Sequence, residues 1–137
     1  MRVTILGCGT SGGVPRPGGK DGRGEWGAAN PADARNRRRR CSILVQDGGK
    51  TVLVDTSPDL RLQTASAGAK RVDAALFTHD HADQAHGIDD LRVFVMRARK
   101  RIPAWMDEAT ETALRSRFPY IFDSQEGYPA LLDGQPV

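Results

Sequence analysis

The feature that most constrains this chain is a cluster of all its histidines within residues 78–87. The cluster reads Thr-His-Asp-His-Ala-Asp-Gln-Ala-His-Gly and directly follows the apolar run 74–77. A buried strand that ends in a loop of imidazoles and carboxylates is a rigid scaffold for a metal ion. His79 and His81 offer imidazole nitrogens to one divalent ion, and Asp83 offers a harder oxygen ligand. The pattern therefore predicts a metal site, rather than a polar turn in which histidines cluster by chance.

Length and composition are those of an ordinary globular protein. The 137 residues suit one domain, and 27% of them are charged. No apolar run approaches the roughly 18 residues of a membrane span, and residues 1–6 lead directly into a strand. These features argue against a signal peptide and predict a cytoplasmic protein that does not contact membranes. The formal net charge of +3 comes largely from the basic run Arg35–Arg40.

Two cysteines are too few to cross-link a domain of this size, and Cys8 and Cys41 do not have the spacing of a metal-binding pair. We expect both to be free, partly buried thiols.

The pattern of apolar residues predicts an α/β fold with a β-rich first half and a more helical second half. Asp47-Gly48-Gly49 is a hairpin turn signal, and Ser57 followed by Pro58 is a helix start. No repeat or interdomain linker is found, and the chain stops at Val137 without a predicted closing element. The expected strands are 2–6, 41–46, 50–55, 74–78 and 102–106, and the expected helices are 57–68, 88–99 and 107–117.

Residues Gly7–Gly12 formally match the dinucleotide-binding pattern Gly-x-Gly-x-x-Gly. That pattern binds pyrophosphate only when a helix begins inside it. The residues that follow, Gly13–Gly19, include two prolines and would not form a helix. Two interpretations remain, namely a tight turn or a loop whose backbone amides bind an anion.

The histidine cluster resembles the His-x-His-x-Asp-His signature of the metallo-β-lactamase superfamily at His79, His81 and Asp83. In that family the two histidines hold one metal ion, and the Asp-His pair helps to hold a second. Gln84 stands at the final position, where it offers only a weak carbonyl ligand, and His86 could replace it or contact substrate. The resemblance implies a divalent ion, zinc or manganese, in one site and leaves the second site open.

Four motifs in order resemble one branch of this superfamily, which contains the phosphoribosyl cyclic phosphate phosphodiesterase of the carbon–phosphorus lyase pathway. Some members of this branch hold a structural zinc through cysteines in the loop after the first strand. Residues 15–40 contain no cysteine, so no such site is expected. The motifs are Gly7–Pro15, Arg38–Val45, Asp55–Arg61 and His79–Arg92.

The resemblance implies that residues 1–137 form a single partial domain, the amino-terminal half of an αββα sandwich. Family members continue with further metal ligands, whereas no histidine follows His86. Without the carboxy-terminal half, one sheet face would be uncovered, and we expect the chain alone to be inactive and to be unstable or self-associate. Candidates for that face are Val3, Ile5, Ile43, Val45, Val52, Val54, Leu76 and Phe77.

For the complete protein the resemblance implies metal-dependent hydrolysis of a small-molecule phosphoester, either a cyclic phosphate or a nucleotide-like compound. Asp83 would be the catalytic residue, as a metal ligand that orients water, and Asp55 would hold a ligand histidine. Arg40 and His86 are candidates for substrate contacts. The basic run would steer an anionic substrate or would simply be a solvated loop.

Two alternatives stay open. An RNA-processing phosphodiesterase of the same superfamily would suit the basic run, although nucleic acid is less favoured because no aromatic residues interleave with the arginines. A non-catalytic binding module with a partial metal site would explain Gln84 and the missing ligands.

Overall fold

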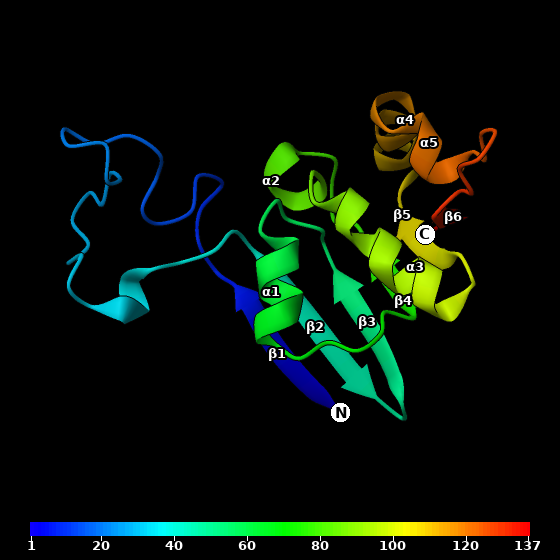
Figure 1. The fold of residues 1–137 in the computed structure, drawn as a ribbon, viewed down its shortest axis with the longest axis horizontal. Helices are drawn as coiled ribbons and strands as arrows, with labels where there is room; N and C mark the ends of the chain where they lie inside the picture. The colour runs from blue at the N-terminus through cyan, green and yellow to red at the C-terminus, as the bar shows by residue number, and fades with distance from the viewer.

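A computed structural model describes all 137 residues as a six-stranded mixed sheet with helices (Figure 1). The strands lie in chain order across the sheet, which confirms the predicted α/β class. The strands are β1 (Arg2–Gly7), β2 (Ser42–Asp47), β3 (Lys50–Val54), β4 (Ala74–Leu76), β5 (Ile102–Met106) and β6 (Leu132–Pro136). The helices are η1 (Ala34–Asn36), α1 (Leu60–Ser66), α2 (Ala82–Ala85), η2 (Ile88–Leu91), α3 (Arg92–Ala98), α4 (Glu108–Arg117) and α5 (Pro119–Phe122).

The sheet changes from antiparallel to parallel after its third strand. Strands β2 and β3 form the predicted hairpin, in which Asp47 pairs with Lys50 across Gly48 and Gly49. Both glycines have positive φ, 51° and 75°, as tight two-residue hairpin turns require. From β3 onward each neighbouring pair is parallel, so each connection crosses over and carries helices.

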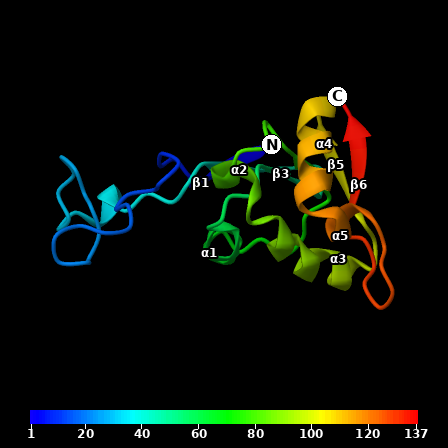
Figure 2. The ribbon, with the colours of Figure 1, turned by 90° about the horizontal axis from the view of Figure 1, so that it is seen from above.

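The helices cover one face of the sheet. Figure 2 shows α1 and α3 on the same side of the strands. Leu44, Leu53, Ala75 and Ala104 lie opposite one another on successive strands and are at most 1% exposed. They belong to a single cluster of buried apolar side chains that forms the core between sheet and helices.

The opposite face of the sheet is apolar and is not covered. Ile5 (68% exposed), Leu76 (38%) and Trp105 (41%) lie on it, and the residues between them are half-buried. Phe77 does not belong to this face, contrary to expectation. Successive residues of a strand point to opposite sides, so with Leu76 on the uncovered face Phe77 points into the core, where it is 5% exposed. We call this surface the apolar sheet face; its residues are Val3, Ile5, Ile43, Val45, Val52, Val54, Leu76 and Trp105.

Some element bounds differ from those predicted. Helix α1 begins at Leu60, later than expected, because the Ser57 carbonyl accepts from the Leu60 amide in a tighter turn and the first helical bond runs from Gln63 to the Asp59 carbonyl. The Ser57 hydroxyl still accepts from the Asp59 amide, as a capping residue does. Strand β4 ends at Leu76, two residues early. The short helices α2 and α5 and the strand β6 were not predicted. Strand β6 pairs in parallel with β5 and is the last strand of the sheet.

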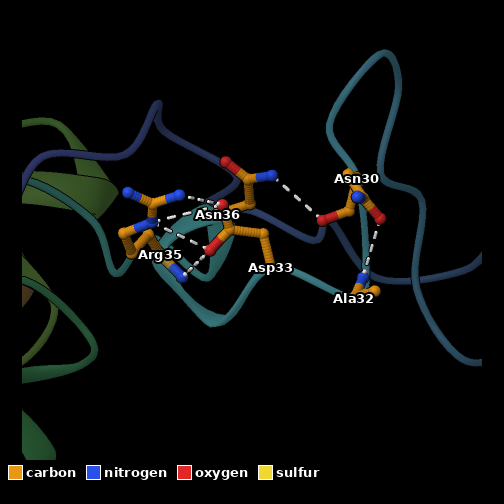
Figure 3. Close-up of polar contacts among 5 residues, drawn as sticks. All are labelled: Asn30, Ala32, Asp33, Arg35 and Asn36. Atoms are coloured by element: carbon orange, nitrogen blue, oxygen red, sulfur yellow. Dashed lines mark hydrogen bonds and ion pairs between the residues drawn. The ribbon is translucent and has the colours of Figure 1, made fainter.

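The loop between β1 and β2 extends away from the sheet in both views (Figures 1 and 2). Its short helix η1 is capped by Asp33, whose carboxylate accepts from the Arg35 amide at 2.9 Å and pairs with the Arg35 guanidinium (Figure 3). That guanidinium lowers the pKa of Asp33. Asn30 bonds both Ala32 and Asn36 at 3.0 Å, so local polar contacts define this part of the loop.

None of the helices is both long enough and apolar enough to cross a membrane.

Candidate metal centre

The three predicted metal ligands come together beyond the end of β4. Ligand atoms of His79, His81 and Asp83 all lie within 4.8 Å of one another, and the two imidazole rings are 4.7 Å apart. The chain is extended through His81, and α2 then begins, which places Asp83 in the first helical turn. Two imidazole nitrogens and one carboxylate oxygen form a donor set that suits zinc and similar divalent ions. These residues therefore fit a metal ion.

Thr78 connects His79 to a buried carboxylate. The Thr78 hydroxyl and amide each donate to Asp55 at 2.8 Å, and the hydroxyl oxygen lies 2.9 Å from His79 Nδ1. Because the hydroxyl proton is given to Asp55, the oxygen accepts from Nδ1–H, and this tautomer leaves His79 Nε2 free for a metal ion. Asp55 is thus connected to a candidate ligand histidine through Thr78 rather than by a direct contact.

Asp55 occupies an unusual backbone position directly after β3. Its φ is 61°, in the left-handed region that aspartate tolerates better than most residues. Burial raises the pKa of its carboxyl group, and the two hydrogen bonds from Thr78 oppose that rise.

Gln84 is buried next to the candidate ligands rather than pointing to solvent. Its side-chain amide donates to Asp83 Oδ2 at 3.1 Å. This contact orients the carboxylate, a role that the motif comparison did not foresee. His86 lies outside the three-residue cluster, and its ring packs edge-on against Phe118 at 5.4 Å.

The histidine loop is held from two sides. On one side the Gly87 amide donates to the Thr56 carbonyl at 2.8 Å, and a Cβ at Gly87 would lie only 2.0 Å from the Ser57 carbonyl oxygen. On the other side Arg117 of α4 bonds both the carbonyl and the carboxylate of Asp80, and this contact lowers the pKa of Asp80. The sequence carries no local signal for Arg117, which is far from the loop along the chain.

Arg40, the predicted substrate contact, is engaged with Asp59. Its guanidinium makes two hydrogen bonds to the Asp59 carboxylate, at 2.8 and 3.0 Å, and its amide makes a third at 2.9 Å. The pairing lowers the pKa of Asp59. Asp59 chiefly, and Asp83 to a smaller extent, raise the pKa of Arg40, so this arginine lies within electrostatic reach of the candidate metal centre.

The glycine-rich segment after β1 packs tightly against the arginine run. The amides of Gly9 and Val14 donate to carbonyls of residues 39 and 38 at 2.7 and 2.9 Å, and the Gly13 amide bonds within its own turn. These amides are therefore used within the backbone, which favours the tight-turn interpretation. No helix begins in the segment, which confirms that it is not a dinucleotide-binding turn.

Both cysteines are free, as predicted, but they are exposed rather than partly buried. Cys8 follows β1 and Cys41 precedes β2, so each lies just beyond the covered part of its strand.

Comparison with known proteins identifies the family. Residues 50–134, more than half of the chain, match the model of the beta-lactamase superfamily domain. The chain therefore belongs to the metallo-β-lactamase superfamily. Within it, the chain aligns with a crystal structure described as a new diphosphatase from the PhnP family, with 37% identity and a TM-score of 0.83. That alignment covers 98% of this chain and 49% of the diphosphatase, which supports the predicted branch.

Other similar proteins are named for different activities. A protein of Porphyromonas gingivalis (strain ATCC BAA-308 / W83) named octanoyltransferase is 36% identical over 123 residues, which is 89% of this chain and 24% of that protein. A ribonuclease Z of Bradyrhizobium sp. (strain ORS 278) is 39% identical over 56 residues, 39% of this chain and 19% of that protein. Zinc-bound PqqB from Methylobacterium extorquens shares the fold, with a TM-score of 0.71 and 21% identity over 100% of this chain and 46% of that one. The chain thus spans at most about half the length of these relatives.

Proposed function

We propose that the complete protein is a metal-dependent phosphodiesterase that acts on a small cyclic phosphate or nucleotide-like substrate. The observation that carries the proposal is the convergence of His79, His81 and Asp83 beyond a buried strand, in a chain of the metallo-β-lactamase superfamily.

Each residue of the candidate metal centre would have a separate role in the reaction. His79 and His81 would hold a divalent ion, zinc or manganese, which supplies Lewis acidity and water of lowered pKa when bound. Asp83 would complete this ligand set and orient the water, held in place by Gln84. Asp55 and Thr78 would fix the His79 tautomer.

An anionic substrate is supported by a basic cavity elsewhere in the chain. A cavity of about 690 Å³ lies where the glycine-rich segment meets Arg37, Arg38 and Arg39. Positive charge along a cavity raises the local concentration of a phosphate ester. The PhnP-family relative is itself named a diphosphatase, which supports a substrate with a phosphate ester or anhydride bond.

Two other functions remain candidates. The similarity to ribonuclease Z supports an RNA-processing phosphodiesterase, again with the arginine run as the contact surface. Gln84, at the position where the family signature has histidine, would suit a binding module that holds a metal ion without turnover.

We further propose that the chain corresponds to the amino-terminal half of the family domain and that the protein is cytoplasmic. The half-length alignment with the PhnP-family structure supports the first proposal. The other half would then supply the remaining metal ligands and cover the apolar sheet face.

The direct test is a substrate comparison with the complete, metal-loaded protein. We expect turnover of a cyclic ribose phosphate or a nucleotide diphosphate ester to exceed cleavage of a structured precursor RNA. Asp83→Asn should reduce turnover by at least about 10- to 100-fold, the loss seen even for groups behind metal ligands, whereas the exposed Asp21→Asn should not. Preferential RNA cleavage would support the second function, and metal binding without turnover of any substrate would support the third.

A further inference from the structure

A second cavity lies on the helical side of the molecule, away from the histidine loop in the chain. It has a volume of about 570 Å³, within the range of small-molecule binding pockets, which is roughly 300–1,000 Å³. The cavity is formed by α3, the turn that follows it, and the segment that leads into β6. Because α3 lies on the opposite side of the sheet from the apolar sheet face, a partner seated on that face would leave α3 free (Figure 2).

The lining combines an apolar floor with a basic rim. Val95 of α3 and Leu131 before β6 are buried and give the floor its apolar character. No acidic residue lines the cavity, so its charge is purely positive. The basic residues are Arg92, Arg99, Lys100 and Arg101.

The cations of the rim differ in how far they are already paired. Arg92 bonds Asp89 and the Tyr128 hydroxyl and lies over the Tyr128 ring, but its Nε is buried without a hydrogen-bond acceptor. Arg99 and Lys100 form no ion pair and no side-chain hydrogen bond. The rim therefore holds unneutralised positive charge beside one unsatisfied donor.

Arg99 also sits where another residue would be more stable. It ends α3 in the left-handed conformation, with φ of 51°, a position that glycine occupies at much lower cost. An arginine kept in a strained position at the mouth of a cavity is the kind of outlier that points from geometry to function.

We propose that this cavity binds an amphipathic organic anion, a compact negatively charged head on an apolar body. The head would lie among Arg92, Arg99 and Lys100, and the body would lie on Val95, Met96 and Leu131. The chemistry fits because a charged head pairs with cations that have no partner, and an apolar body covers the exposed Met96 side chain. This site is independent of the phosphodiesterase proposed above.

A pair of probes that differ only in charge tests the proposal in the complete protein. Naphthalene-2-sulfonate carries the anionic head, and naphthalene-2-sulfonamide has the same shape without the charge. Binding is measured by titration with observation of methyl signals in NMR spectra. We expect the sulfonate to bind at least about fivefold more tightly than the sulfonamide, as one or two partly exposed charge contacts would give. The shifted signals should be those of Val95, Met96 and Leu131.

Variants separate this role from a structural one. The double variant Arg99→Gly with Lys100→Gln should weaken sulfonate binding by at least about fivefold, while its melting temperature stays the same or rises because glycine relieves the strained φ. Arg97→Gln changes a residue of the same helix that lies outside the cavity, and this variant should bind the sulfonate as tightly as the wild-type protein does. Equal binding of the two probes, shifts confined to the apolar sheet face, or no binding at millimolar concentration would overturn the proposal.

Discussion

The Thr78 hydroxyl group fixes the orientation of His79 in the candidate metal centre. It donates to buried Asp55 and accepts from His79, so its removal frees the His79 ring to rotate or change tautomer. We expect Thr78→Val to weaken metal binding by about 10-fold or more, as losses behind a ligand histidine do. Competition with a chelating dye measures this affinity, with Thr112→Val on the exposed side of α4 as the matched control. Equal metal affinity in both variants would show that Thr78 does not hold the ligand.

A substitution at Gln84 tests how many metal ions the site holds. An imidazole binds borderline divalent ions far better than an amide oxygen does. We therefore expect Gln84→His to raise the metal content of the complete protein from nearer one ion per chain towards two, as measured by elemental analysis after dialysis. The same substitution removes the hydrogen bond to Asp83, so the first site should bind somewhat less tightly. Two tightly held ions before the substitution would mean that another group, such as His86, already fills this role.

At the scale of elements, the Arg40–Asp59 pair fixes the loop after β1 to the start of α1. Because Arg40 lowers the pKa of folded Asp59 below its ordinary value of 3.8, the pair stabilises the fold above that pH. This contribution is lost as pH falls from about 3.8 through the lower folded-state pKa. We expect Asp59→Asn to cost about 1–2 kcal/mol of unfolding free energy at pH 7 and progressively less in acid, since the pair is partly exposed. Urea unfolding at pH 7 and near pH 3 measures the difference, and an equal cost at both would contradict the assignment.

Elements were predictable where a local pattern sufficed. The hairpin at Gly48-Gly49 and the Asp107-capped helix α4 follow from turn and cap signals within a few residues, and both were predicted correctly. Strand β6 was missed because its Leu-Asp-Gly-Gln-Pro sequence has little strand propensity and gains its structure from pairing with β5. The start of α1 was misplaced because Ser57 and Pro58 form a tight turn ahead of the helix, and the same capping residues precede both kinds of turn.

In the candidate site, too, local patterns were predictable and contacts between distant residues were not. His79, His81 and Asp83 were predictable because a few consecutive residues carry the whole ligand pattern. The supports of that pattern were only partly predictable, since Asp55 acts through Thr78 and Arg117 reaches Asp80 from a distant helix. Such contacts depend on the packing of elements rather than on spacing along the chain.

At the scale of the whole molecule, the apolar sheet face dominates the behaviour we expect. Large contiguous apolar patches on monomers mark interaction surfaces or cause aggregation. We expect the 137-residue chain prepared alone to self-associate, with an apparent mass that rises with concentration in analytical ultracentrifugation. Ile5→Lys should reduce this association, whereas Val93→Lys, at a similarly exposed apolar residue on α3, should not. A monomeric chain that unfolds cooperatively would contradict the prediction.

If the loop beyond β4 holds a divalent ion through His79, His81 and Asp83, the metal content of the protein must depend on these residues. The complete protein is dialysed against zinc or manganese in turn, and bound metal is determined by elemental analysis beside the double variant His79→Ala with His81→Ala. We predict about one tightly bound ion per chain, lost when both imidazole ligands are removed, with a fold that remains intact by circular dichroism. Equal metal content in the two proteins, or none in either, would contradict it.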